Sequence, residues 1–176
     1  DGFIAPGHAS AILGSNIYND IAEKYKRPFV VAGFEAEHIL LAIFDLVNQI
    51  MKQKHEVHNI YPSVVKPEGN VVARYYIGKY FDISSAYWRG IGVIPDSGFS
   101  LKQTYRCFDA GSDILLSETE GMLTKCRCGE VILGKINPPE CSMFRKNCTP
   151  QNAKGPCMVS PEGTCGIWYR FAKVDY

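Results

Sequence analysis

Six of the seven cysteines in the chain lie between Cys126 and Cys165. The surrounding segment, 121–165, shows little hydrophobic periodicity and is rich in proline and glycine, so it offers few apolar side chains for a core. The whole chain of 176 residues is 46% hydrophobic, and a chain of that length and composition can fold without disulfides. The segment therefore predicts that something bound to the sulfur atoms orders it.

Three kinds of site can account for the clustered thiols. A disulfide framework is disfavoured because the chain is not small and Cys107 makes the number of cysteines odd. Structural zinc sites usually contain Cys-x-x-Cys pairs or histidines, but no such pair occurs and all four histidines lie in the first third of the chain. An iron–sulfur cluster needs four thiolates at looser spacing, which leaves two cysteines for a neighbouring dithiol.

Charge and packing predict different environments for the clustered cysteines and for Cys107. Six lysines and arginines accompany the cysteines in 121–165, against three glutamates. Positive charge near a thiol lowers its pKa and favours metal ligation and thiol–disulfide exchange. Cys107 is predicted to be an inert buried thiol, since free cysteine packs like a small apolar side chain.

Ahead of the cysteine-rich segment, hydrophobic patterning predicts alternating strands and helices. Such alternation is typical of Rossmann-like βαβ units, in which helices cover a parallel sheet. We therefore predict an α/β domain over 1–109 and a loop-rich, cysteine-rich iron–sulfur cluster region over 110–176. The predicted strands are 1–5, 28–34, 59–65 and 87–101, and the last of them contains a turn at 95–98. A first helical stretch is predicted to end before Pro28, and two further helices are predicted over 36–54 and 70–82.

The clearest predicted helix is 36–54. Its apolar residues recur at three- and four-residue steps, which predicts that this face packs on the sheet as core. His38, His55 and His58 fall on or just after its polar side, and they are predicted to be solvated.

Composition excludes several classes of partner. The net charge is +1 with no long run of one sign, so we expect no nucleic acid partner. No apolar run approaches the length of a membrane span and the start has no signal-peptide layout, so we expect no membrane association and a cytoplasmic location. The first residue is Asp1 rather than methionine, so the chain is expected to be a fragment.

Six stretches, in order, resemble the C-terminal part of the HypD family of hydrogenase maturation proteins. The resemblance covers nearly the whole chain. The stretches are "DGFIAPGHAS", "VVAGFE", "VKPEGN", "WRGIGVIPDSG", "CFDA" and the cysteine segment "CRCGEVILGKINPPECSMFRKNCTPQNAKGPCMVSPEGTC".

The resemblance implies a protein with a four-iron four-sulfur cluster that acts in the assembly of the [NiFe]-hydrogenase metal centre. It implies a small HypC-type chaperone as partner, a HypE-type cyanide donor, and a transient iron that receives CN and CO ligands. The Cys-Gly-x-His motif that the family associates with holding this iron is absent from the chain. Smaller departures from the family pattern are Ala36, Lys66 and Pro161.

The four-plus-two count and the resemblance together suggest how the six cysteines divide. We expect Cys128 and Cys157 to form a redox dithiol, and an interchange of Cys126 with Cys128 remains open. The expected cluster ligands are Cys126, Cys141, Cys148 and Cys165.

Six further residues are candidates for a cleft or a partner surface. His8 follows a predicted strand end, where α/β proteins place functional loops, and the resemblance favours a cleft role over a purely structural one. Glu35 either faces the same cleft or interacts with a helix start. The remaining candidates are Glu68 and Asn70, which can also shape a turn, and Trp88 and Arg89, which can also form a stacked structural pair.

The predicted function is therefore a redox-active scaffold for metal-centre assembly rather than a free-standing enzyme. The alternatives are a thiol–disulfide oxidoreductase with a cluster-linked dithiol, and a zinc-stabilised binding module with no redox role.

Overall fold

A computed structural model of the chain describes residues 1–88, 90–110 and 125–172. The chain forms two compact units, Asp1–Tyr80 and Phe81–Tyr176. This division lies earlier than the predicted boundary at residue 109, because the segment after Tyr80 is grouped with the cysteine-rich part. Among the described residues, no helix is both long and apolar enough to cross a lipid bilayer.

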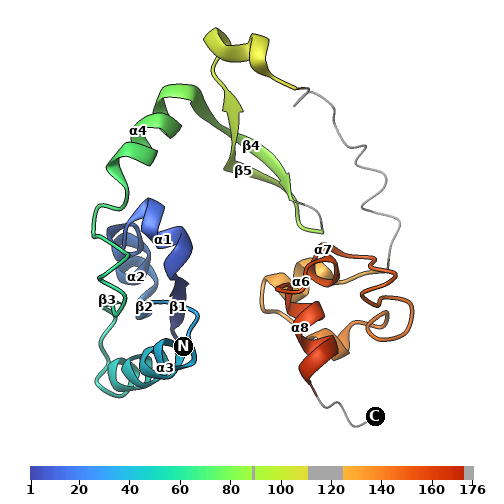
Figure 1. Ribbon diagram of the computed structural model, residues 1–176. Coiled ribbons are helices and arrows are strands. Elements are labelled where there is room, and N and C mark those ends of the chain that lie inside the picture. The colour runs from blue at the N-terminus through green and yellow to red at the C-terminus, as the bar shows by residue number, and fades with distance from the viewer. Residues whose placement is uncertain (89, 111–124, 173–176) are drawn as a thin grey trace. The chain divides into compact units, whose positions relative to one another are not determined.

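The first unit is built on a three-stranded parallel sheet (Figure 1), which confirms the predicted α/β class. The strands are β1 (Phe3–Pro6), β2 (Phe29–Ala32) and β3 (Val57–Asn59), in the order β1-β2-β3. The register places Phe3 opposite Phe29 and Phe29 opposite Val57.

Helices lie between the strands of this unit and after the last of them. They are α1 (Gly7–Leu13), the 3-10 helix η1 (Asn16–Tyr18), α2 (Asn19–Tyr25), α3 (Ala36–Met51) and α4 (Val71–Tyr80). The region predicted as one helix before Pro28 is divided at Gly14, where φ is 89°. A Cβ atom there would collide with the backbone of 67–69, so glycine permits both the left-handed φ and the close approach of that loop.

The core of the first unit lies on both faces of β2, whose four residues are all buried. Side chains alternate between faces along a strand. Phe29 and Val31 pack with Ala22 of α2, whereas Val30 and Ala32 pack with Ala42 and Leu46 of α3. The sheet is therefore covered on each face by a helix, as a parallel sheet requires.

Helix α3 uses a narrower buried stripe than its sequence predicts. Its buried residues are Ala42, Leu46 and Gln49. The prediction that the broad apolar face is core is wrong, because most of that face is exposed, with Phe44 at 67% and Met51 at 78%. Only three strands of three or four residues lie beneath the helix, so one helical stripe is enough to cover them.

The strand predicted at 59–65 is displaced and shortened. Strand β3 ends at Asn59, whose side chain then organises a turn: its Nδ2 donates to the Val65 carbonyl at 2.9 Å, and the Tyr61 backbone N–H donates to its Oδ1 at 3.0 Å. Asparagine favours such side-chain-to-backbone bonds over continued pairing.

The second unit begins with an antiparallel hairpin of β4 (Phe81–Trp88) and β5 (Gly92–Leu101). The prediction of a single strand over 87–101 is therefore wrong. The predicted turn at 95–98 is a bulge inside β5, since Ser84 pairs with Gly98 while Ala86 pairs with Ile94. Asp96 has a φ of 51°, which accommodates the extra residues of the bulged strand.

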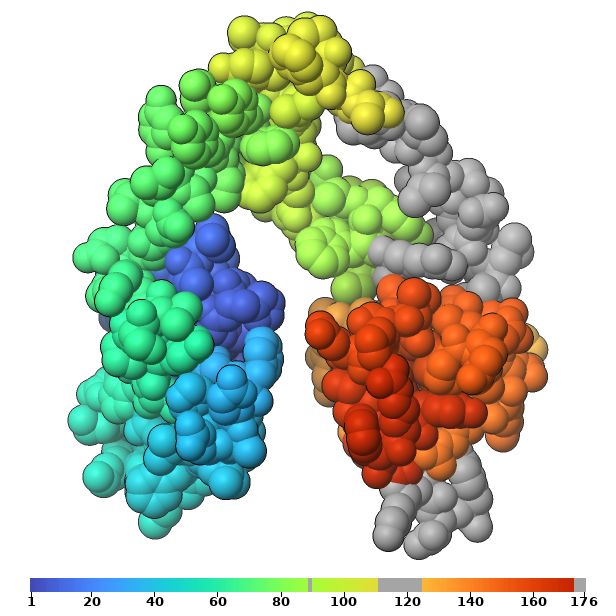
Figure 2. All heavy atoms as spheres, viewed as in Figure 1, coloured from blue at the N-terminus to red at the C-terminus, as the bar shows by residue number. Residues whose placement is uncertain are grey.

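The rest of the second unit consists of short helices and loops. After the 3-10 helix η2 (Gln103–Phe108), the elements are α6 (Cys128–Ile132), η3 (Pro138–Glu140), α7 (Pro156–Val159) and α8 (Thr164–Phe171). Residues 125–172 pack into one body, coloured orange to red in Figure 2.

Candidate thiol and metal centre

The core of residues 125–172 is made largely of sulfur. Five of the six clustered cysteines are buried and Cys126 packs against them. We use the name cysteine core for the eight buried residues of this segment: Cys128, Val131, Cys141, Phe144, Cys148, Cys157, Met158 and Cys165. Because helices of four to eight residues have little stability of their own, these contacts hold the segment together.

Local backbone structure positions the middle cysteines. Asn137 and Glu140 form a capping box around η3, and the Cys141 backbone N–H that follows donates to the Pro138 carbonyl at 3.1 Å. The Cys148 backbone N–H donates to the Met143 carbonyl at 2.9 Å, and its Sγ accepts from the Lys154 backbone N–H at 3.4 Å.

Three thiols meet where α6, α7 and α8 come together. Cys128 is the first residue of α6, Cys157 lies in α7, and Cys165 lies in the first turn of α8. The Sγ atoms of Cys157 and Cys165 are 3.2 Å apart. Cys157 also interacts with the Cys128 side chain, so Cys157 lies beside two other thiols. The structure leaves all seven cysteines free.

The environment raises the pKa of three of the clustered thiols instead of lowering it. Burial raises the pKa of Cys126 to about 12. The interaction with Cys157, together with burial, raises the pKa of Cys128 well above its usual value. The contact with Cys128 lowers the pKa of Cys157, but Cys165 and burial outweigh it and raise that pKa to about 12. The prediction of lowered thiol pKa values is therefore wrong for these three cysteines.

Two of the nearby cations form contacts with groups other than the thiols. Arg127 forms a two-pronged ion pair with Glu130 at 2.6 and 2.7 Å. Arg145 directs its Nη2 to the carbonyls of Trp168, Tyr169 and Ala172 at 3.3, 3.0 and 2.7 Å. Its guanidinium also lies 5.6 Å from the Phe144 and Tyr169 ring centroids.

Arg145 is a structural residue that the sequence analysis missed. Its contacts join the loop between Cys141 and Cys148 to the C-terminal end of α8, the helix that carries Cys165. A φ of 58° at Arg145 is an uncommon conformation for a residue with a Cβ atom. The structural role of Arg145 is visible only in its backbone conformation and contacts, and no sequence pattern around it indicates that role.

Cys107 does not belong to this centre. It lies in η2 and is exposed, so the prediction of a buried thiol is wrong. The short 3-10 helix around it buries none of its residues.

The donor set of the cysteine core fits an iron–sulfur cluster in number and kind. Four thiolates suffice for such a cluster, and five thiols share one interior with Cys126 packed against them. Glycines at positions 90 and 155 leave room beside the Cys128 Sγ, since a Cβ atom at either would lie within 3 Å of it. The thiols of the described residues are packed against one another, and in that part of the chain no group of three or more Cys, His, Asp or Glu is arranged around a metal position.

Two other candidate residues lie at the carboxyl edge of the parallel sheet in the first unit. His8 follows β1, and its ring centroid is 5.2 Å from that of Phe34, which follows β2. Glu35 precedes α3 and makes no capping hydrogen bond through its side chain. This edge is where open α/β sheets usually bind ligands.

His38 lies in the first turn of α3, next to this edge, and is not simply solvated as predicted. Its ring centroid is 5.0 Å from that of Tyr61. Its Nδ1 is buried against Gly33 and has no hydrogen-bond partner in the described structure. The sequence pattern around 36–54 gave no signal for this contact, because Tyr61 comes from a separate loop.

The remaining candidates have structural contacts. Asn70 caps α4, since its Oδ1 accepts from the Ala73 backbone N–H at 3.0 Å, and the Glu68 carbonyl accepts from Arg74 at 3.0 Å. The Trp88 Nε1–H donates to the Ser97 hydroxyl at 2.8 Å within the hairpin. Arg89 lies outside the described residues, so the predicted Trp88–Arg89 pair has no structural description.

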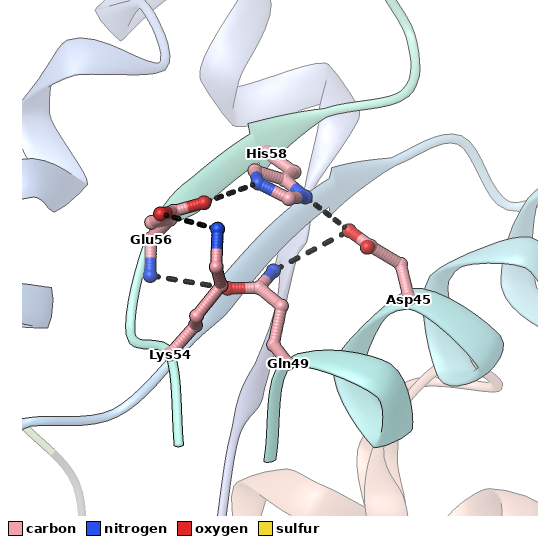
Figure 3. A network of polar contacts seen from close by, with 5 residues as sticks. All are labelled: Asp45, Gln49, Lys54, Glu56 and His58. Carbon is pink, nitrogen blue, oxygen red and sulfur yellow. Dashed lines mark hydrogen bonds and ion pairs between the residues drawn. The ribbon is translucent and has the colours of Figure 1, made fainter. Parts of the chain in front are cut away.

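His58 is the centre of a polar network between α3 and β3 (Figure 3). Its Nδ1 lies 2.7 Å from Asp45 Oδ2 and its Nε2 lies 3.1 Å from Glu56 Oε2. Glu56 also pairs with Lys54 at 3.0 Å, and Gln49 bridges Asp45 and the Glu56 backbone. Two carboxylates can both accept from the ring only when it is protonated. His58 is thus held in an ion-paired network that the sequence did not indicate, while its side chain stays 39% exposed.

Comparison with known proteins identifies the family. The family model described as "HypD: Hydrogenase formation hypA family" matches residues 1–172. The hydrogenase maturation factor HypD of Escherichia coli K12 is 40% identical over 99% of this chain and 48% of its own length. Hydrogenase maturation factor HypD1 of Bradyrhizobium diazoefficiens is 38% identical over 99% of this chain and 46% of its own length.

A relative from Methanocaldococcus jannaschii, whose name refers to hydrogenase expression and formation, is 41% identical over 99% of this chain and 49% of its own length. The chain thus spans about half the length of the curated relatives that it matches. The match along nearly the whole chain agrees with the resemblance seen in its motifs. The chain belongs to the HypD family.

Proposed function

We propose that this chain acts in [NiFe]-hydrogenase maturation as an iron–sulfur scaffold and redox protein. The observation that carries the proposal is the cysteine core, in which five thiols of a HypD-family chain are buried together and a sixth, Cys126, packs against them. A segment this poor in other apolar residues has no evident reason to bury five thiols unless they bind something or react with one another.

Within this function, Cys126, Cys141, Cys148 and Cys165 hold a four-iron four-sulfur cluster, and Cys128 and Cys157 form the dithiol. The interaction between the Cys128 and Cys157 side chains supports the dithiol. The 3.2 Å separation of the Cys157 and Cys165 sulfurs supports a second division, in which Cys157 pairs with Cys165 and Cys128 becomes a ligand. Cys157 belongs to the dithiol in both.

When bound, a cluster of this type supplies or accepts single electrons. The dithiol stores them in pairs: reduction of the Cys128–Cys157 disulfide breaks its Sγ–Sγ bond, takes up two electrons and two protons, and gives two thiols. Burial of both thiols keeps water and large oxidants from the sulfur atoms. The chain's own residues thus hold and protect a two-electron store beside a one-electron centre.

The assembly role implies partners and a substrate. A HypC-type chaperone works with the chain, a HypE-type protein donates cyanide, and the iron that becomes the Fe(CN)2CO centre is the cargo. Exposed apolar side chains on α3, among them Leu40 and Phe44 at 67% each, support contact with another protein segment. Seven free cysteines support a reducing, cytoplasmic location.

Iron and sulfide analysis tests the proposal. Anaerobically purified protein should contain about four iron and four acid-labile sulfide per chain, with broad visible absorbance that bleaches on reduction. A colourless protein with one zinc would refute the redox function and favour the zinc-stabilised module. Reduction of a generic disulfide at full rate without any partner would favour the free thiol–disulfide oxidoreductase.

Single Cys→Ala variants then assign the six cysteines. Loss of iron in the variants at 126, 141, 148 and 165, with iron retained at 128 and 157, is the expected pattern. Cys107→Ala is the matched control, because Cys107 is exposed and lies outside the cysteine core. Iron loss in Cys128→Ala together with iron retention in Cys165→Ala would instead favour Cys157 and Cys165 as the dithiol and Cys128 as a cluster ligand.

A further inference from the structure

The Cys128 thiol lies between two glycines from separate parts of the second unit. Gly90 lies in the turn between β4 and β5, and Gly155 immediately precedes α7. Figure 2 shows the hairpin, in light green, reaching the body formed by residues 125–172. Cys128 is 4% exposed, whereas Gly90 is itself exposed, so the Gly90 backbone lies between this thiol and solvent.

The contact at Gly90 leaves no room for a side chain. A Cβ atom at Gly90 would lie 2.5 Å from the Cys128 Sγ, and a Cβ atom at Gly129 would collide with the Gly90 carbonyl oxygen. Favourable contacts between nonbonded carbon atoms lie near 3.5–4.0 Å. The turn and the start of α6 can therefore approach this closely only because both positions are glycine.

Gly155 closes the opposite side of the thiol. A Cβ atom there would lie 2.7 Å from the Cys126 Sγ and 2.9 Å from the Cys128 Sγ. The φ of Gly155 is −125°, an extended conformation that any residue can adopt. Its lack of a side chain is thus required by the sulfur atoms and not by the backbone.

We infer that Gly90 and Gly155 are positioning residues for the Cys128 thiol, and that the Gly90 backbone is the cover that keeps this thiol against Cys157 and away from solvent. This inference rests on the proposed role of Cys128 as one of the redox thiols. It adds the element that controls access to that thiol: reagents or partners reach Cys128 only when the Gly90 backbone moves. Nothing in the cysteine segment alone reveals this cover, because Gly90 precedes Cys128 by more than thirty positions in the chain.

Site-resolved alkylation tests the inference. Anaerobically purified protein is treated with iodoacetamide, and peptide mass spectrometry gives the alkylation rate of each cysteine relative to exposed Cys107. Gly90→Ala should raise the relative rate of Cys128 about tenfold, since the added Cβ must displace the turn or rotate the thiol off its rotamer. Gly155→Ala should raise the rates of Cys126 and Cys128 without backbone strain.

Gly92→Ala is the matched control for strain. Gly92 has a φ of 110°, comparable to 85° at Gly90, but a Cβ atom at Gly92 would meet nothing within 4 Å. In the Gly92→Ala variant, the alkylation rate of Cys128 relative to Cys107 should stay within about twofold of that in the unsubstituted protein. Equal rates for Gly90→Ala and Gly92→Ala would overturn the inference, as would a uniform rise at all buried cysteines, which indicates general loosening.

The same experiment separates failure of the inference from failure of the proposed function. Absence of iron from the unsubstituted protein would refute the cluster but would leave the alkylation comparison intact, since each cysteine is read individually. A protein with four iron per chain in which Gly90→Ala leaves the Cys128 rate unchanged would retain the proposed function and refute the Gly90 cover.

Discussion

Replacement of Arg145 by alanine should release the C-terminal end of α8 from the loop between Cys141 and Cys148. The Arg145 Nη2 lies 2.7–3.3 Å from three carbonyl oxygens at that helix end. One NH2 group carries two hydrogens, so it can form two full hydrogen bonds at a time. Charged donors contribute about 1.5 kcal/mol each at the low end, which suits a half-buried site.

The two hydrogen bonds together give about 3 kcal/mol, and the ring contacts at 5.6 Å add to this. Both Arg and Ala carry a Cβ atom, so the substitution does not relieve the left-handed φ and the contacts alone change. A loss of about 3 kcal/mol corresponds to a roughly hundredfold faster local opening. Hydrogen exchange measured over residues 164–172 should show this acceleration.

Two further variants control the experiment. Arg145→Lys keeps the positive charge at the helix end, which contributes about 0.3–1 kcal/mol, and should show an intermediate effect. Lys146→Ala removes the same charge from an exposed neighbour and should change stability by less than about 0.5 kcal/mol. Equal exchange in the Arg145→Ala and Lys146→Ala variants would refute the reasoning. Under the proposed assignment of Cys165 in α8 as a cluster ligand, Arg145→Ala should also lose iron faster to a chelator.

Three other predictions concern the pH dependence of the first unit and the packing of both units. Partial burial lowers the pKa of His58, but hydrogen bonds to Glu56 and Asp45 outweigh it and raise that pKa above 6.5. The protonated His58 therefore stabilises the folded state fully below pH 6.5, and this contribution is lost as pH rises through the higher folded-state pKa. Its side chain is 39% exposed, so the effect is at most about 1 kcal/mol; urea unfolding across pH should show it, and His58→Asn should abolish it. Met158→Ala should cost about 3 kcal/mol, because Met158 is 1% exposed in the cysteine core; a urea midpoint equal to that of the unsubstituted protein would contradict this. Asn70→Ala should cost about 1 kcal/mol as a lost helix cap, seen as faster hydrogen exchange in the first turn of α4, while Asn70→Asp should retain protection.

The sequence predicted the fold class because local patterns reported it directly. The run "FVVA" at 29–32 is apolar throughout, as befits a strand buried on both faces, and it is the centre of the parallel sheet. The helices near 36–54 and 70–82 were also predicted within a few residues of α3 and α4. Periodicity identifies such elements well because it depends only on neighbours along the chain.

Predictions about burial failed where they depended on what an element packs against. The apolar face of α3 was predicted as core, yet the short strands beneath it bury only a narrow stripe. Cys107 was predicted to be buried on residue type alone, but the helix η2 that carries it buries nothing. Residue type states a preference for burial, whereas the neighbouring elements decide whether a burial site exists.

For the cysteine centre, the sequence by itself determined which residues take part: six thiols, their spacing, and a surrounding segment with little else to bury. Only the tertiary structure decided their environment. It brought Cys157 to two other thiols, directed Arg145 to helix carbonyls, and placed Gly90 from a distant hairpin against Cys128. The physical reason is that thiol chemistry depends on burial and on contacts within a few ångströms, and those contacts join residues that no local pattern along the chain connects.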